Sequence, residues 1–297
     1  MKTLAIDIGG TKFTVALFEH GSEGPRIVRR ESKLTDRAGG REWLLEELSQ
    51  VARNWCAEAQ PASCGIGFGG PVDFVKQRVA LSTHVSGWNG FPLREYFQDL
   101  LGIPTVIDND ANAGALGEAI YGAGVGSRPL FYVTLSTGIG GGLVLEGDQV
   151  YRGADSWAGE IGHITLDPGG PECLCGARGC FERLCSGLWL ERDHGRPAQE
   201  LLQDPEFTAR YADDVARGLK AAVMLLNPAR IVIGGGISKA GDRLLAPLRA
   251  ALRHHIPPWS GANVEVSLAA LGDESVLWGA MWRGLSACRV ESRLDLS

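Results

Sequence analysis

A short apolar run, a glycine-rich turn and a second apolar run open the chain, and the same pattern returns near its middle. The first turn is 9–12 and the second is 136–142. Alternation around such turns predicts β-hairpins. The strands predicted in the two copies are residues 4–8 and 13–18, then 130–135, 143–145 and 149–151. A single repeat at this long spacing is typical of two related domains and not of a solenoid.

Apolar residues at helical spacing alternate with further short strands along the rest of the chain. Asp204 and Pro205 start the longest predicted helix as its N-cap and first residue, and Ser238 is the expected N-cap of a later one. The predicted helices are 41–57, 92–101, 111–119, 204–226, one from 238 and one from about 272. The further strands are 26–30, 64–68, 105–107 and 230–233. Strands alternating with helices predict α/β layers.

We expect two domains that meet in a cleft, since the chain has no Ser/Pro-rich linker. Residues 1–108 form the smaller α/β domain with the first glycine turn. Residues 109–297 form the larger one, and its last helix is free to pack back on the smaller domain.

One histidine and three cysteines lie close together in the sequence, at His163, Cys173, Cys175 and Cys180. This is the ligand set of a closed tetrahedral zinc site, which organises structure and does not activate water. Glu160 and Glu182 flank the ligands, which indicates a pocket for a small polar molecule. The alternative is three buried cysteines in a glycine-rich turn.

Composition narrows the class of protein. The chain has 297 residues, 44% hydrophobic and 22% charged, as in soluble globular proteins. A net charge of −6 argues against broad binding to nucleic-acid phosphates. We expect no membrane span, no signal peptide and a reducing, cytoplasmic location, because the remaining cysteines form no disulfide pattern. His84, His194, His254 and His255 have no partner pattern and are expected at the surface.

The glycine turns favour phosphate binding. Asp7 ends a strand and precedes the turn, where exposed backbone N–H groups, Thr11 and Lys12 could approach a phosphate, and Asp7 could hold hydrated Mg²⁺. An ordinary hairpin turn explains the same residues. Residues 136–140 form a second such turn and 234–236 a third candidate, for which close strand–helix packing is the alternative. No Walker-type motif is present.

Asn109 and Asp110 lie between a predicted strand and a predicted helix. A carboxylate at this place could accept a proton from a substrate hydroxyl, and phosphoryl transfer needs positioning more than a strong base. Asp110 could equally cap the helix that follows. The residues alone leave both roles open.

The motifs, taken in order, resemble the ROK family of bacterial sugar kinases and repressors (repressors, open reading frames, kinases). The segments that carry the resemblance are 7–12 (DIGGTK), 69–73 (GGPVD), 109–112 (NDAN), 135–141 (LSTGIGG), 160–163 (EIGH), 173–182 (CLCGARGCFE) and 233–236 (IGGG). They span nearly the whole chain. The resemblance implies a duplicated ribonuclease-H-like fold of the actin and hexokinase type, with ATP and sugar bound between the two domains.

The resemblance also implies roles for individual residues. Asp110 corresponds to the catalytic base, and Asp7 to the acid near Mg²⁺. The implied sugar contacts are Asn109, Glu160, His163 and Glu182, and the implied structural zinc ligands are His163, Cys173, Cys175 and Cys180. The implied nucleotide contacts are Gly10, Thr11, Lys12, Thr137 and Gly138 at the phosphates and Gly235 on the adenosine side.

The expected activity is ATP-dependent phosphorylation of a hexose at its 6-hydroxyl, with glucose the first choice. His84 and Val85 replace the Asn-Leu that often precedes the Gly-Trp of glucokinases, so N-acetylmannosamine, N-acetylglucosamine, mannose and fructose remain alternatives. A sugar-sensing repressor is the third hypothesis, although Asp7 leaves no room for a preceding DNA-binding domain. We expect sugar and nucleotide as partners, no nucleic acid or membrane, and a homo-oligomer.

Overall fold

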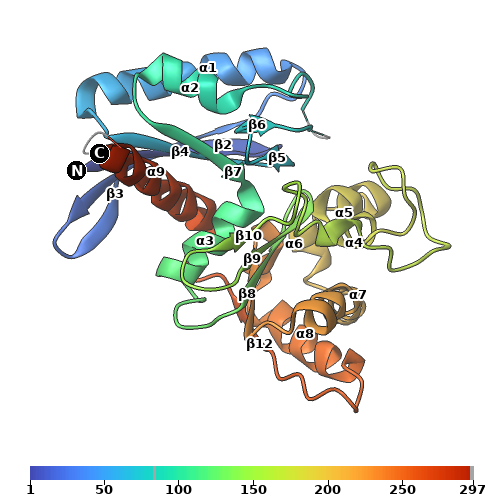
Figure 1. Ribbon diagram of the computed structural model, residues 1–297. Helices are drawn as coiled ribbons and strands as arrows, with labels where there is room; N and C mark the ends of the chain where they lie inside the picture. The colour runs from blue at the N-terminus through green and yellow to red at the C-terminus, as the bar shows by residue number, and fades with distance from the viewer. Residues whose placement is uncertain (83–84, 295–297) are drawn as a thin grey trace. The chain divides into compact units, whose positions relative to one another are not determined.

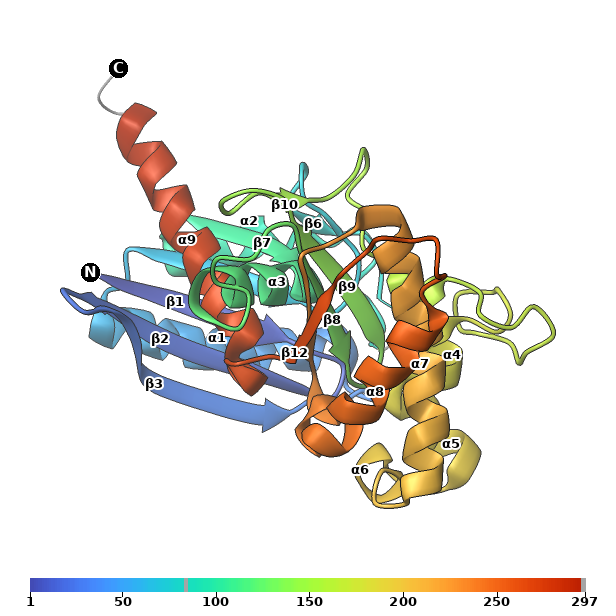
Figure 2. The same cartoon turned by 90° about the horizontal axis from the view of Figure 1, so that it is seen from below.

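The computed structural model describes residues 1–82 and 85–294, and His84 lies outside the described residues. The chain divides into two compact units. The first unit comprises residues 1–117, 152–157 and 276–297, and the second comprises residues 118–151 and 158–275. Figures 1 and 2 show the ribbon in two views. Among the described residues, we find no helix with the length and apolar character that a membrane span requires.

The first unit contains a five-stranded sheet in the order β3-β2-β1-β4-β7. Three strands form an antiparallel meander, and β4 and β7 continue the sheet parallel to β1. The strands are β1 (Lys2–Ile8), β2 (Lys12–Gly21), β3 (Gly24–Leu34), β4 (Ser63–Phe68) and β7 (Thr105–Asn109), with a separate small hairpin of β5 (Val72–Asp73) and β6 (Arg78–Val79).

Helices cover both faces of this sheet. Helices α1 (Gly40–Ala59) and α2 (Leu93–Leu101) lie on one face, and α9 (Ser275–Leu294) lies on the other (Figure 1). Leu44, Leu48 and Phe97 are fully buried with the apolar side of the sheet. On the opposite face the backbones approach so closely that a Cβ on Gly65 would lie 1.7 Å from the Ala280 carbonyl oxygen. Glycine is therefore required where α9 crosses β4.

The second unit repeats the same sheet. Its order is β10-β9-β8-β11-β12, and again three antiparallel strands are followed by two parallel ones. The strands are β8 (Leu130–Leu135), β9 (Ile139–Val144), β10 (Val150–Tyr151), β11 (Arg230–Gly234) and β12 (Glu265–Leu268). Two sheets with equal order and equal directions confirm the duplicated fold predicted from the repeated hairpin.

The helices of the second unit pack on this sheet through one apolar cluster. The long helix α7 begins as predicted, because the Asp204 side chain accepts a hydrogen bond from Glu206 N at 2.9 Å and Pro205 is its first residue. The helices and helical turns are η1 (Ile161–His163), α4 (Phe181–Cys185), α5 (Gly187–His194), α6 (Ala198–Leu201), α7 (Pro205–Leu226), η2 (Gly236–Ala240), α8 (Asp242–His255) and η3 (Gly272–Glu274). Helix α3 (Asp110–Tyr121) starts in the first unit and ends in the second.

Two local predictions were wrong. Helix α8 begins at Asp242 and not after Ser238. The Ser238 hydroxyl donates to the Gly235 carbonyl at 2.7 Å and does not cap the helix, and Gly241 (φ 64°) has a backbone conformation that is not helical. Strand β9 begins at Ile139, inside the segment predicted as a turn. The glycines there are paired strand residues.

Candidate active site and metal centre

Three parallel strands of the first unit end at one edge of the sheet. In β1, β4 and β7 the register places Asp7 beside Gly67 and Gly67 beside Asp108. The segments that follow these strands therefore start at the same edge. They are the glycine turn 9–12, the pair Gly69-Gly70 and the pair Asn109-Asp110. Carboxyl ends of parallel strands are the usual ligand-binding edge of an α/β sheet.

The first glycine turn is held by two residues just beyond β3. The Thr35 hydroxyl donates to the Gly9 carbonyl at 3.1 Å. Arg37 donates from Nε to the Gly10 carbonyl at 2.8 Å and from Nη2 to Thr11 Oγ1 at 3.2 Å. The sequence reasoning missed Thr35 and Arg37, since only the β2–β3 register brings them to the turn. Arg37 adds a second cation beside Lys12, which suits an anionic ligand.

Asn109 connects two segments of this edge. Its Oδ1 accepts the backbone N–H groups of Ala111 at 3.0 Å and Asn112 at 3.1 Å, so Asn109 is the N-cap of α3. Its Nδ2 donates to the Gly70 carbonyl at 3.0 Å. The cap that the sequence left open for Asp110 is thus supplied by its neighbour.

Asp110 is the first residue of α3 and is partly exposed. Its Oδ1 accepts the Ala111 N–H at 2.8 Å. The surrounding protein removes water from the carboxyl and raises its pKa to about 6, although the Ala111 N–H acts in the opposite direction. Gly69 adjoins the carboxylate, since a Cβ on it would lie 3.5 Å from Asp110 Oδ2. Above pH 6 the side chain is a ready proton acceptor.

The second glycine turn is fixed by the start of α5. The backbone N–H groups of Gly187 and Leu188 donate to the carbonyls of Ser136 at 2.7 Å and Thr137 at 3.2 Å. Gly235 (φ 82°) lies against the end of β8, since a Cβ there would lie 2.3 Å from the Leu135 carbonyl oxygen. The second unit therefore brings together the predicted phosphate turn and the predicted adenosine-side turn.

Glu160, His163 and Glu182 also belong to the second unit. The segment with Glu160 and His163 lies directly on β9, since a Cβ on Gly162 would lie 2.1 Å from the Ile139 carbonyl oxygen. Glu182 is 8% exposed, and its Oε2 accepts the Ile139 N–H at 2.9 Å. This bond, which the sequence did not indicate, joins the cysteine segment to the second turn.

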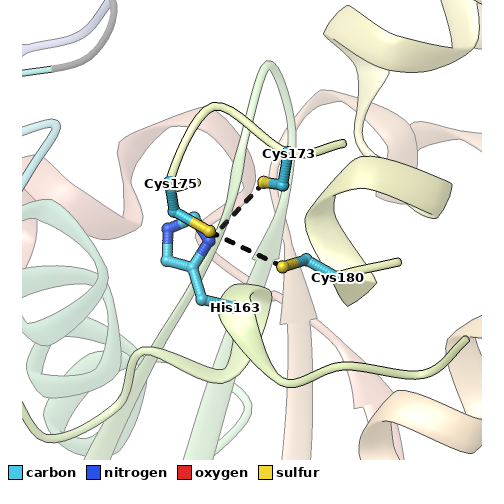
Figure 3. Close-up of side chains that lie close together, drawn as sticks. All are labelled: His163, Cys173, Cys175 and Cys180. Carbon is cyan, nitrogen blue, oxygen red and sulfur yellow. Dashed lines mark hydrogen bonds between the residues drawn. The ribbon is translucent and has the colours of Figure 1, made fainter. Parts of the chain in front are cut away.

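The four predicted metal ligands converge (Figure 3). The candidate ligand atoms of His163, Cys173, Cys175 and Cys180 all lie within 4.8 Å of one another. Cys175 Sγ is 3.6 Å from Cys180 Sγ, and Cys173 Sγ is 3.9 Å from His163 Nδ1. A tetrahedral zinc with ordinary bond lengths separates two sulfurs by about 3.8 Å and a sulfur from a nitrogen by about 3.6 Å. The donor set therefore fits a closed zinc site in both chemistry and spacing.

Backbone hydrogen bonds hold the turn that carries the cysteines. Cys173 N donates to the Ala177 carbonyl at 2.8 Å, and Gly176 N donates to the Cys173 carbonyl at 3.0 Å. Burial is the main cause that raises the pKa of the Cys180 thiol, to about 12, and its hydrogen bond with Cys175 adds to it. Neighbouring thiolates repel one another, so these thiols do not readily ionise together. A bound dication would supply the positive charge that stabilises them as thiolates.

The family model described as the ROK family matches residues 3–283. The chain belongs to the ROK family. A glucokinase of Thermotoga maritima is 31% identical over 94% of this chain and 96% of its own length. The ROK hexokinase structure from Thermus thermophilus has a TM-score of 0.80 at 35% identity and covers 98% of this chain and 100% of its own. A Streptomyces griseus ROK glucokinase, solved with glucose and AMPPNP, has a TM-score of 0.85 at 27% identity over 96% of this chain and 100% of its own.

The predicted site residues fall into two groups, one in each unit. The first unit holds the base candidate and the first turn, namely Asp7, Gly10, Thr11, Lys12, Asn109 and Asp110. The second unit holds Thr137, Gly138, Glu160, His163, Glu182, Gly235 and the three cysteines.

Proposed function

We propose that this ROK protein is an ATP-dependent sugar kinase that phosphorylates the 6-hydroxyl of a hexose, with glucose as the main substrate. The observation that carries the proposal is Asp110, a carboxylate with a pKa near neutrality at the head of α3, among glycine segments at the end of the sheet. Similarity over nearly the whole chain to a glucokinase, and to a glucokinase structure holding glucose and AMPPNP, supports the same reaction.

In this proposal Asp110 accepts the proton of the sugar hydroxyl while that oxygen attacks the γ-phosphorus of ATP. The bond to the β-phosphate oxygen breaks as the new bond forms, and ADP leaves. Such a transition state is loose, so the gain comes from alignment and charge neutralisation. Asn109 would orient the sugar from a rigid position, because its own amide is already bonded to Gly70 and to the first turn of α3.

The glycine turns and Lys12 would hold the nucleotide phosphates, with Arg37 supporting the first turn. Asp7 would hold the Mg²⁺ that accompanies ATP, and Mg²⁺ supplies charge neutralisation at the phosphates. His163, Cys173, Cys175 and Cys180 would hold a structural zinc ion, which supplies a rigid anchor for the segment that carries Glu182. The expected homo-oligomer, the cytoplasmic location and the cleft between the domains stay predictions.

A coupled assay of ADP formation over a panel of hexoses and N-acetylhexosamines tests the proposal. We expect the highest kcat/KM with glucose, and ³¹P NMR of the product should show a phosphomonoester at the 6-position. Faster turnover of an N-acetylhexosamine would move the assignment to the alternative named above, and no turnover of any sugar would reject the kinase. Asp110→Asn is the matched control for residual background.

A further inference from the structure

Asp108 lies two residues before Asp110 and is buried, with a side chain only 3% exposed. Arg152 binds it with both arms of the guanidinium fork. Nη2 contacts Oδ2, and Nε donates to Oδ1 at 3.3 Å. The Arg152 side chain is itself 14% exposed. A forked pair of this kind fixes the orientation of both partners, which a lysine cannot do.

Asp108 passes this constraint on to the first turn of α3. Its Oδ1 also accepts the backbone N–H of Asn109 at 3.0 Å and lies 3.4 Å from Asn112 Nδ2. Asn109 precedes Asp110, and Asn112 follows it by two residues. The buried carboxylate therefore holds the backbone just before the proposed base and the Asn112 side chain just after it.

Residues 152–157, which we name the strap, are fastened to the same part of the first unit. The Arg152 guanidinium carbon lies 3.6 Å from the centroid of the Phe74 ring, and the Phe74 N–H donates to Ser156 Oγ at 3.2 Å. Arg283 of α9 approaches the same groups, 3.7 Å from Asp108 Oδ2 and 6.0 Å from the Phe74 ring centroid. The strap is thus held near each of its ends.

The strap lies in the sequence between two segments of the other unit. The residues before the strap, 118–151, and those after it, 158–275, belong to the second unit, whereas the strap belongs to the first. Ser156 has a φ of 67°, a left-handed conformation that non-glycine residues seldom adopt. Glu160, a proposed sugar contact, follows the strap by three residues.

We propose that Arg152 is a positioning residue of the phosphoryl-transfer site: it clamps Asp108 beneath the Asn109-Asp110 turn and anchors the strap that leads to Glu160. The inference rests on the proposed function. Arg152 acts through Asp108 and touches no substrate in this scheme. Its loss should therefore reduce alignment of the base and leave nucleotide binding intact.

A buried charge pair also contributes to stability, so the test must separate the two roles. Asp108→Asn leaves the Arg152 and Arg283 guanidinium groups without their shared carboxylate, and Arg152→Met leaves Asp108 with the more distant Arg283 alone, so each variant should lower stability. The double variant removes the Arg152–Asp108 pair as a whole and leaves only the charge of Arg283, so it should regain part of the stability that Asp108→Asn loses. The alignment of Asp110, the proposed base, should not be restored in the double variant.

We expect Arg152→Met to lower kcat about 100-fold, the size of effect that follows from misplacing a catalytic group by about 1 Å. The KM for ATP should change by less than about twofold, and Arg152→Lys should recover little, because lysine lacks the fork. In Asp108→Asn/Arg152→Met the melting temperature should return toward that of the wild type while kcat stays low. Hydrogen exchange of the peptide 105–116 should be faster in the double variant.

Arg230→Met is the matched control. Arg230 is also partly buried, binds Glu265 at 2.6 Å and belongs to the second unit, outside the proposed machinery. It should lose stability without the kcat defect. Recovery of both kcat and stability in the double variant, or unchanged exchange of peptide 105–116, would overturn the positioning role. Exchange is measured without substrate, so an inactive wild type would reject the proposed function and leave the exchange result standing.

Discussion

Replacing Asp110 with Asn should raise the stability of the protein at pH 8 and at the same time lower its turnover. The folded protein raises the pKa of this carboxyl from 3.8 to about 6 by removing water from it. The folded state therefore binds the proton more tightly than the unfolded state does. This favours folding at low pH, and the advantage is lost as the pH rises through 6. At pH 8 the carboxylate is ionised in both states and destabilises the fold, and Asn removes that destabilisation.

The magnitude follows from the pKa difference. A difference of roughly two units corresponds to about 3 kcal/mol, since each unit is worth about 1.4 kcal/mol. The carboxyl is partly exposed, so we expect about 1–2 kcal/mol in practice. Scanning calorimetry from pH 4 to pH 8 should show a melting temperature higher by about 2–6 °C for Asp110→Asn at pH 8. The gap should close near pH 4, where the wild-type carboxyl becomes protonated in both states.

Turnover should also depend on the ionisation of Asp110, but the substitution that stabilises the fold should slow the reaction. In the wild type, kcat/KM for the sugar should fall about tenfold per pH unit below pH 6. Asp110→Asn should be slower than the wild type by about 10²- to 10⁴-fold at pH 8, and this difference should shrink below pH 6. Asp73→Asn in the same unit is the control of opposite sign, because hydrogen bonds from Lys76 lower the pKa of Asp73. An Asp110→Asn variant that melts below the wild type at pH 8, or that phosphorylates sugar at the wild-type rate, would refute the reasoning.

Three further predictions test the metal centre, the first turn and the helix packing. Cys175→Ser should release zinc, measured by elemental analysis, and weaken sugar binding; zinc retained at full stoichiometry would show that the ligand set is wrong. Arg37→Met should raise the KM for ATP by about fivefold, since a charged donor to the first glycine turn is lost. Gly279→Ala should lower the unfolding free energy by about 3 kcal/mol in urea titrations, because the new Cβ would lie 1.7 Å from the Ala113 carbonyl oxygen. Gly261→Ala, with no atom near its Cβ, is its control and should change little.

The features that the sequence predicted well are those encoded within a few residues. Alternating apolar residues and a glycine turn defined both hairpins, and Asp204 with Pro205 marked the start of α7. The clustering of the four candidate ligands falls in this group too, because Cys173, Cys175 and Cys180 are close in the chain and Gly176 permits the tight turn between them (φ 90°), whereas metal binding itself stays a prediction. At these places the residue types and the local backbone geometry favour the same structure, so the sequence pattern was sufficient to predict it.

The contacts that the sequence did not reveal all depend on register between distant segments. Arg37 reaches the first turn only because β3 pairs with β2, and Arg152 reaches Asp108 only because the strap belongs to the first unit. The glycines after Gly138 were assigned to a turn because glycine is rare in strands. Glycine is tolerated in β9 because the backbone of Gly159 packs directly on this strand. A Cβ on Gly159 would lie 2.3 Å from the Gly141 carbonyl oxygen.

Glu118 shows how one such non-local residue can organise a duplicated fold. The chain first leaves the first unit between Gly117 and Glu118 and, after the strap, returns to it for the last time after Ser275. The Glu118 side chain is fully buried and accepts hydrogen bonds from Ser275 Oγ at 2.7 Å, Leu271 N at 2.9 Å and Ala270 N at 3.0 Å. The residues at which α3 enters and α9 leaves the second unit are therefore tied to a single carboxylate. A buried carboxylate with several donors tolerates little displacement, because each lost bond leaves an unpaired polar group. It follows that the last turn of α3 and the first residue of α9 are held at one rigid point in the second unit.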